Sequence, residues 1–451
     1  MFGLALRSLR KRAGGFLASF LAMFLGAAII MAFASMLDTS IRGEATGAAA
    51  ETLTVMAMVV GSWGLVLVIL AVTSTLTLSV RQRAEEMALL KSIGATPAQL
   101  GRMVVGEAAG LALVAWALAI VPAMLMGMGL LSLLHSTDQV PESIGYAFGP
   151  IAPAMGLGIT LVSAAGAAVI TVRRTARARV AESLADAAVG EASMSRKRVV
   201  GGILFLLLAL YLGVMTATLM RGKGTDAMAM AGQADIFAAL GLALLAPWLI
   251  RRIAGALAGP LGRLGVAGDL AVSTMRRRTG QMAGVVMPII LFTGIAVGTI
   301  YLQEIENDAT AAAGLLSTVE QKNIATLNFV VIGMILVFTA LMLVNTLIAA
   351  TAYRRREFGQ QRLAGATPGQ VLGAVTLEGV LLTGIGLVCG AFAALFTVIP
   401  FSIARVGTAL PDVGPLTFAG VAAIAAALTM VTALGAARRA VRVPAIEAVA
   451  V

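Results

Sequence analysis

An uncharged run of 22 residues near the start of the chain limits its fold most strongly. Residues 16–37 read FLASFLAMFLGAAIIMAFASML and contain no Asp, Glu, Lys or Arg. A helix of about 20 apolar residues crosses the hydrocarbon core of a bilayer. Hydrophobic residues make up 59% of the chain and charged residues only 12%, which is more apolar than a soluble protein needs. The sequence therefore predicts an integral membrane protein.

The apolar runs do not alternate with polar residues as membrane β-strands do, so we predict an all-α, polytopic fold. We expect about ten transmembrane helices. Their approximate ranges are 15–37, 55–80, 103–134, 150–172, 199–220, 233–250, 282–302, 326–351, 374–400 and 414–437. The first run is too long for the apolar part of a signal peptide, and we therefore count it as a span.

The basic residues predict the orientation of these spans. With the N-terminus in the cytoplasm, all but five of the 33 Lys and Arg residues lie on the cytoplasmic side. The five are Arg42, Arg221, Lys223, Lys322 and Arg405. This bias follows the positive-inside rule and places both termini in the cytoplasm. The net charge of +11 is then a result of topology and lipid contact, so we expect membrane lipids as partners and no nucleic acid.

The sequence offers no residues for catalysis or metal binding. Cys389 is the single cysteine and His135 the single histidine, so neither a disulfide framework nor a metal cluster is expected. No Walker A pattern, G-x-x-x-x-G-K-[ST], occurs in the chain. We therefore predict no enzymatic activity, no metal and no nucleotide site in this polypeptide.

Two polar inserts between apolar runs have nearly the same sequence. Residues 91–107 read KSIGATPAQLGRMVVGE, and residues 361–378 read QRLAGATPGQVLGAVTLE. The matching glycines, Gly94 and Gly365, lie 271 residues apart. Matches on either side, at offsets of 266 and 265, extend the duplication. They pair Leu4–Gly14 with Leu270–Gly280, and Arg173-Arg174 and Glu182 with Arg438-Arg439 and Glu447.

This duplication predicts three parts. Two four-helix repeats occupy residues 1–187 and 266–451, and a linker with two spans occupies 188–265. Both repeats begin and end on the same side of the membrane, so they are parallel.

Each insert is predicted to form a helix, a sharp corner and a second helix that re-enters the membrane. We call this unit an elbow. The glycine ends the first helix in the left-handed conformation. The threonine caps the second helix, the proline takes its first position, and the glutamine completes a capping box. The corresponding pairs are Gly94 and Gly365, Thr96 and Thr367, Pro97 and Pro368, and Gln99 and Gln370.

Glu107 and Glu378 are the only acidic residues that we place inside spans. Carboxylates in a membrane are costly and are therefore candidates for function. Each lies about 16 Å along its helix from the cap, at 1.5 Å per residue, which is close to the membrane surface. We expect a structural role, in which each glutamate pairs with an arginine of an elbow or span end. A proton relay is the alternative.

The charged helix, the (I/A)-G-A-T-P-x-Q motif and the later glutamate resemble the FtsX-like permease domain. Two such domains and ten spans are most similar to the ten-span branch of the MacB-type (type VII) ABC systems, which includes bacitracin-type peptide permeases. The resemblance implies a permease subunit driven by a separate ABC ATPase, expected as a dimer, that binds ATP and Mg. It implies ATPase contacts in residues 81–102 and 354–370. The candidate contact residues are Arg83, Glu86, Lys91, Gly94, Thr96, Pro97, Gln99, Arg354, Glu357, Arg362, Gly365, Thr367, Pro368 and Gln370.

One feature departs from that family. The loops at 38–54 and 303–325 are too short for the large outer domain that many members carry. An amphipathic substrate, such as a peptide antibiotic, a lipid or a lipid-linked compound, would then be handled among the spans or with an exported accessory protein. The location implied is the cytoplasmic membrane of a bacterium. An ATPase-driven signal transmitter that controls an extracellular enzyme or sensor kinase is an alternative function, and a proton-driven transporter is another.

Overall fold

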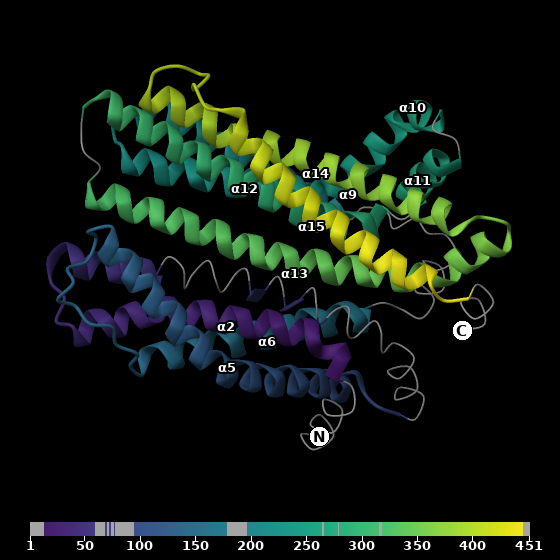
Figure 1. Ribbon diagram of the computed structural model, residues 1–451, viewed down its shortest axis with the longest axis horizontal. Coiled ribbons are helices and arrows are strands. Elements are labelled where there is room, and N and C mark those ends of the chain that lie inside the picture. The colour runs from purple at the N-terminus through teal and green to yellow at the C-terminus, as the bar shows by residue number, and fades with distance from the viewer. Residues whose placement is uncertain are drawn as a thin grey trace. The chain divides into compact units, whose positions relative to one another are not determined.

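A computed structural model describes residues 13–58, 68–69, 72–73, 76, 94–177, 196–263, 266–277, 279–314 and 318–444. All regular structure in these residues is helical, which confirms the all-α prediction. Figure 1 shows the helices. They are α2 (Ala13–Arg42), α5 (Pro97–Ser136), α6 (Ile151–Arg177), α8 (Arg196–Leu219), α9 (Thr225–Ala256), α10 (Ala258–Gly262), α11 (Val266–Arg277), α12 (Thr279–Ala312), α13 (Val319–Leu363), α14 (Pro368–Arg405) and α15 (Pro415–Val441).

Eight helices in the described part of the chain are long and apolar enough to cross a membrane. These stretches are Ser19–Arg42, Ala98–Ser136, Ile151–Val169, Arg196–Leu219, Asp226–Ala256, Met282–Ala312, Pro368–Arg405 and Pro415–Val441. Each overlaps one of the ten predicted spans. The predicted span 55–80 lies mostly outside the described residues, and 326–351 lies within the 45-residue helix α13.

Large apolar side chains on the outside of these helices fit a hydrocarbon solvent. Leu204, Leu207 and Tyr211 on α8 are all more than half exposed, as is Leu125 on α5. A water-soluble protein rarely carries such long exposed apolar faces, whereas a membrane helix needs them. The chain is thus a multi-pass membrane protein.

The described residues pack into two compact units. One unit comprises Met1–Ser183 and Ser317–Leu341, and the other comprises Leu184–Leu316 and Met342–Val451. Helices α8 and α9, which join the two repeats in sequence, therefore pack in the second unit, where α9 contacts both α12 and α14. Helix α13 contributes its first part to one unit and its second part to the other.

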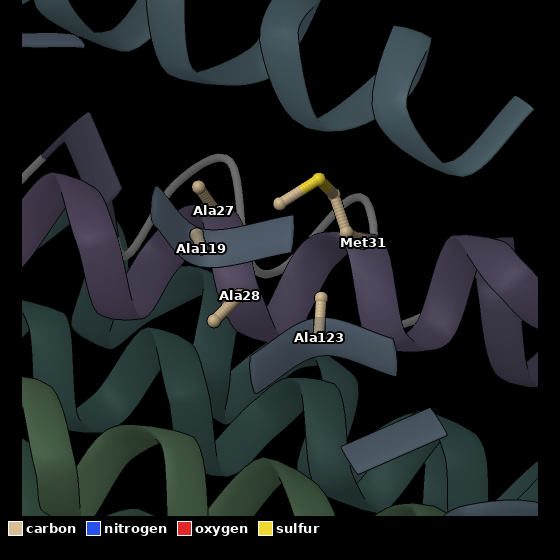
Figure 2. Packing of buried hydrophobic residues seen from close by; sticks show 5 residues of the cluster. All are labelled: Ala27, Ala28, Met31, Ala119 and Ala123. Atoms are coloured by element: carbon tan, nitrogen blue, oxygen red, sulfur yellow. The ribbon is translucent and has the colours of Figure 1, made fainter. Parts of the chain in front are cut away.

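Small side chains let α2 and α5 approach closely in the first unit. Ala27, Ala28 and Met31 of α2 form a buried cluster with Ala119 and Ala123 of α5. Figure 2 shows these residues at the crossing of the two helices. Dispersion contacts and hydrogen bonds must stabilise helix association in lipid, and both need short distances between backbones.

In the second unit, glycines allow the same close approach between α12 and α14. Gly390 lies so close to α12 that an added Cβ would come within 2.6 Å of the Thr293 Cβ and 2.9 Å of the Gly294 backbone nitrogen. A backbone atom cannot move aside as a flexible side chain can. The α12–α14 interface therefore has no room for a methyl group at this position.

We predict that Gly390→Ala lowers the free energy of unfolding by about 1–3 kcal/mol, because the added methyl group overpacks the interface. Gly384→Ala is the matched control, since it lies on the same helix with nothing within 4 Å of an added Cβ. Alanine there should be neutral or stabilise by up to about 1 kcal/mol. Thermal unfolding of both variants in detergent measures the difference. Equal stability of the two variants would contradict the packing described above.

Candidate functional site

The corners of the two elbows have nearly identical backbone geometry. Gly94 has φ +95° and Gly365 has φ +100°, so both glycines occupy the left-handed region that other residues rarely adopt. The helices α5 and α14 begin three residues later. The sequence prediction of a glycine corner in each repeat is confirmed.

A complete capping box begins both α5 and α14. In the first elbow the Gln99 backbone N–H donates to Thr96 Oγ1 at 3.3 Å, and the Thr96 N–H donates to Gln99 Oε1 at 2.9 Å. The equivalent distances for Thr367 and Gln370 are 3.2 and 2.8 Å. Proline occupies the first turn in both copies. These interactions fix where each helix starts.

The first helix of the second elbow, α13, ends in a Schellman motif. The Ala366 N–H donates to Gln361 O at 2.9 Å, and the Gly365 N–H donates to Arg362 O at 3.1 Å. Helix α13 is continuous up to Leu363, so the predicted extension of the second span into the elbow is confirmed for the second repeat. The corresponding segment of the first repeat, 81–93, lies outside the described residues.

Arg362 links the second elbow to α15, the last helix of the same repeat. Its Nη1 donates to Val441 O at 3.0 Å and to Val443 O at 2.7 Å. A cation at the C-terminal end of a helix satisfies carbonyl groups that lack intrahelical donors. The ends of α13, α14 and α15 are thereby connected at one corner. The role of Arg362 as an ATPase contact stays a prediction.

The tips of both elbows are exposed. The exposed residues are Gly94, Thr96 and Gln99 in the first elbow, and Leu363, Gly365, Thr367, Pro368 and Gln370 in the second. Leu363 is an apolar side chain with 57% of its surface exposed. Rigid, accessible corners of this kind suit contact with another protein.

Some predicted contact residues have no described position. Arg83, Glu86 and Lys91 lie outside the described residues, as does the side chain of Arg354. Glu357 is partly buried in the last turns of α13. The structure thus describes the cap of the first elbow and, within the second unit, the second-elbow residues from Glu357 to Gln370.

Glu107 and Glu378 lie at equivalent places on α5 and α14 and are buried, with 3% and 6% of their surfaces exposed. Both lie in helices that are long and apolar enough to cross a membrane, and their place inside the membrane stays a prediction. The expectation that they are the only acidic residues there is wrong. Asp38, Asp235 and Glu306 also lie in helices that can cross the membrane, and each is at most 2% exposed. Asp38 and Glu306 belong to helices that continue past the apolar run, whereas Asp235 lies within the predicted span 233–250.

Asp38 holds the start of α6 at the ends of the helices opposite the elbow. Its carboxylate accepts the backbone N–H of Ile151 at 3.2 Å and that of Ala152 at 2.8 Å. One turn earlier on α2, Ser35 accepts a hydrogen bond from the Tyr146 hydroxyl at 3.2 Å. Burial raises the pKa of Tyr146, so this hydroxyl keeps its proton and donates. We call these contacts the distal clasp.

The second repeat has a distal clasp of its own. The Thr417 hydroxyl donates to Glu304 Oε1 at 2.5 Å, and the Tyr301 hydroxyl donates to Gly414 O at 3.0 Å. Asp38 and Glu304 lie 266 residues apart, and Ala152 and Thr417 lie 265 apart, which are the offsets of the sequence repeat. In both repeats the first helix thus binds the start of the fourth. The clasps were not predicted from the sequence. Continuing the two offsets matches Asp38 with Glu304 and Ala152 with Thr417 as equivalent positions, but it does not show which residues are in contact.

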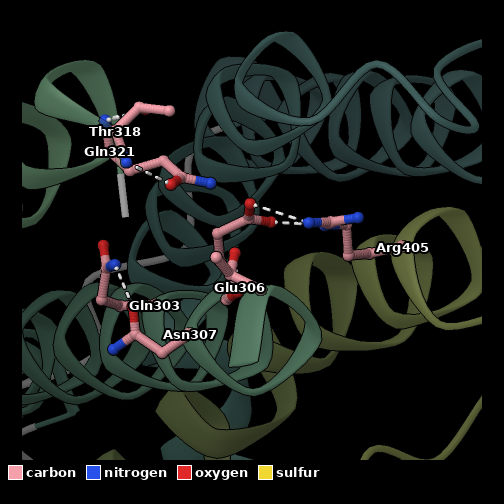
Figure 3. A network of polar contacts seen from close by, with 7 residues as sticks. Gln303, Glu306, Asn307, Thr318, Gln321 and Arg405 are labelled. Atoms are coloured by element: carbon pink, nitrogen blue, oxygen red, sulfur yellow. Dashed lines mark hydrogen bonds and ion pairs between the residues drawn. The ribbon is translucent and has the colours of Figure 1, made fainter. Parts of the chain in front are cut away.

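An ion pair reinforces the second repeat near its clasp. Arg405 Nε lies 2.8 Å from Glu306 Oε2, and Nη2 lies 3.2 Å from Oε1. Figure 3 shows the carboxylate of Glu306 on α12 facing the guanidinium of Arg405 at the end of α14. This two-point geometry is the strong form of an arginine–carboxylate pair. It joins α12 to α14 at their distal ends.

The profile of a known protein family matches both repeats of the chain. The profile of the FtsX-like permease C-terminal domain matches residues 58–177 and again 329–445, together more than half of the chain. The chain belongs to the FtsX-like permease family. Each matched segment of the permease contains one elbow and runs to the end of a repeat. No curated protein matches the chain significantly.

The family indicates the kind of complex in which such permeases work. FtsX-like permeases are membrane subunits of ABC transporters and lack ATPase domains, and they generally pair with an ABC ATPase. The resemblance seen in the sequence is thereby confirmed at the level of the family and its duplication. The more specific assignment to the MacB-type branch stays a prediction.

We predict that Asp38→Ala lowers the free energy of unfolding by about 2–3 kcal/mol, because two N–H groups of α6 lose a charged acceptor. Glu51→Ala is the control, since Glu51 is exposed in the same part of the chain. Thermal unfolding in detergent measures both variants. A loss no larger for Asp38→Ala than for Glu51→Ala would show that the distal clasp does not stabilise the fold.

Proposed function

We propose that this permease is the membrane subunit of a ten-span, MacB-type ABC transporter in a bacterial cytoplasmic membrane. A separate ATPase dimer binds both elbows from the cytoplasm and supplies the energy from ATP and Mg. The observation that carries the proposal is the pair of exposed, fully capped corners with matching geometry. A partner with two similar subunits can contact both of them.

The elbows are built to transmit force. Helices α5 and α14 run without a break from the elbow through a span-length apolar stretch. In the second repeat, α13 enters the corner as a continuous helix, and Arg362 attaches the end of α15. A displacement of this corner therefore moves three helix ends together. A loose loop would absorb the same displacement.

The substrate proposed is a lipophilic or amphipathic molecule, such as a peptide antibiotic, a lipid or a lipid-linked compound. The segments 38–54 and 303–325 have too few residues to fold an outer domain that grips a soluble substrate. The exposed apolar faces of α5 and α8 instead offer contact with molecules dissolved in the bilayer. An exported accessory protein is the other route for such a substrate.

We predict that Leu363→Glu reduces co-purification of the ATPase about tenfold or more, because a charge would replace the exposed apolar side chain of the second elbow. Leu410→Glu is the matched control, since Leu410 is 83% exposed in the loop between α14 and α15. Reversing the charges of Arg83, Glu86 and Arg354 should also abolish the complex. If the complex survives these substitutions but is lost in Leu410→Glu, the assignment of the elbows as the ATPase contacts is wrong.

Transport itself is tested in proteoliposomes that contain the permease and its ATPase. A fluorescent phospholipid and a cationic amphipathic peptide serve as probes. We expect ATP to move at least one of them across the bilayer or out of it, and we expect no movement with Leu363→Glu. An intact, ATP-hydrolysing complex that moves neither probe would favour the signal-transmitting function. Movement driven by a proton gradient without the ATPase would favour a secondary transporter.

A further inference from the structure

Asp235 is an ionisable group without a partner inside the second unit. It lies on α9, within the span-length stretch Asp226–Ala256, and only 1% of its surface is exposed. Neither carboxylate oxygen has a hydrogen-bond partner among the described residues. Asp235 belongs to neither the elbows nor the distal clasps. A buried carboxylate in a membrane helix is a candidate functional site by default.

The carboxylate is enclosed where α9 packs against α12 and α14. Gly298 of α12 lies directly against it, so close that an added Cβ would overlap Oδ2 and come within 2.7 Å of the carboxylate carbon. One turn earlier on α9, Ala231 O accepts a hydrogen bond from Thr397 of α14 at 2.5 Å. Asp235 is thus held inside the interface of three helices.

Among the described side chains, the neighbouring helices supply no counter-ion to this carboxylate. Arg405 of α14 pairs with Glu306 of α12, and Arg198 of α8 donates to Leu244 O. The other described ionisable side chains on or next to the helices in contact with α9 do not hydrogen-bond to Asp235. They are Arg196, Lys197 and Tyr211 on α8, Arg263 after α10, Arg276 on α11, Tyr301, Glu304 and Asp308 on α12, and Glu378 and Cys389 on α14.

An ionised carboxylate without a partner in an apolar interior is extremely costly. A bound metal ion would remove the cost, but hard cations need several oxygen ligands. The described residues contain no group of three His, Cys, Asp or Glu side chains that could hold a metal. The contact with Gly298 also leaves no room for an ion on that side. A proton needs neither space nor further ligands.

We propose that Asp235 is a proton-binding site, and that the packed arrangement of α9, α12 and α14 requires the bound proton. Release of the proton places a bare charge between the three helices and favours an arrangement in which water reaches the carboxylate. The packing of the second unit is therefore coupled to pH. This coupling does not depend on the ATPase or on the identity of the substrate.

The test compares thermal unfolding of the full-length permease and Asp235→Asn in detergent from pH 5 to pH 8. The folded state holds a proton that an unfolded aspartate releases above about pH 4, so wild-type stability falls as pH rises. Relative to Asp235→Asn, the unfolding constant of the wild type should rise by up to about tenfold per pH unit. Asp226→Asn is the control, since Asp226 is exposed on the same helix and should keep the wild-type slope.

Two outcomes of the unfolding experiment would overturn the proposal. One is a pH dependence of Asp235→Asn that parallels the wild type. The other is failure of both Asp235→Asn and Asp235→Ala to fold, because the proposal requires only a neutral side chain at this position. An infrared spectrum at pH 8 provides a second readout. The band of a protonated carboxylic acid should be weaker in Asp235→Asn than in the wild type, and unchanged intensity would contradict a bound proton.

Discussion

The first backbone N–H groups of every helix lack intrahelical acceptors, and lipid offers none to replace them. This constraint acts at each point where the chain turns back into the membrane. Thr96 and Thr367 meet it with capping boxes, and so does Thr318 at the start of α13, where the Gln321 N–H donates to Thr318 Oγ1 at 3.3 Å. At the start of α6 the acceptor comes from another helix, through Asp38. Each of these four helix starts therefore has a side-chain acceptor for its first N–H groups.

The elbow ends and the distal ends of the helices differ in where their hydrogen-bond partners come from. At the elbows the caps are local, so the corners remain exposed and available to a partner. At the distal ends Asp38 and Glu304 connect different helices, so the first and fourth helices of each repeat are fastened together. In the proposed function, a push on an elbow would act on helices whose far ends are held. Gly390 and its neighbours on α12 keep the helices between these ends closely packed.

Local features of the fold could be predicted from the sequence, whereas contacts between distant segments could not. The left-handed glycines and the capping boxes depend on residues within six positions of one another, and each was predictable. The spans also followed from apolar length, with eight recovered among the described residues. The bonds from Arg362 to Val441 and from Asp38 to Ala152 join residues 79 and 114 positions apart, and only packing brings them together. Asp235 was not predicted as a site from the sequence, because a single aspartate barely changes the mean hydropathy of its span.

The central claim is that both elbows bind the ATPase, and hydrogen exchange of the assembled complex tests it most directly. Backbone amides at 94–99 and 365–370 would be compared in the permease alone and in the complex with its ATPase and a non-hydrolysable ATP analogue. The account predicts slower exchange at both elbows and unchanged exchange in the loop at 406–414. Unchanged exchange at both elbows in a fully assembled complex would contradict it.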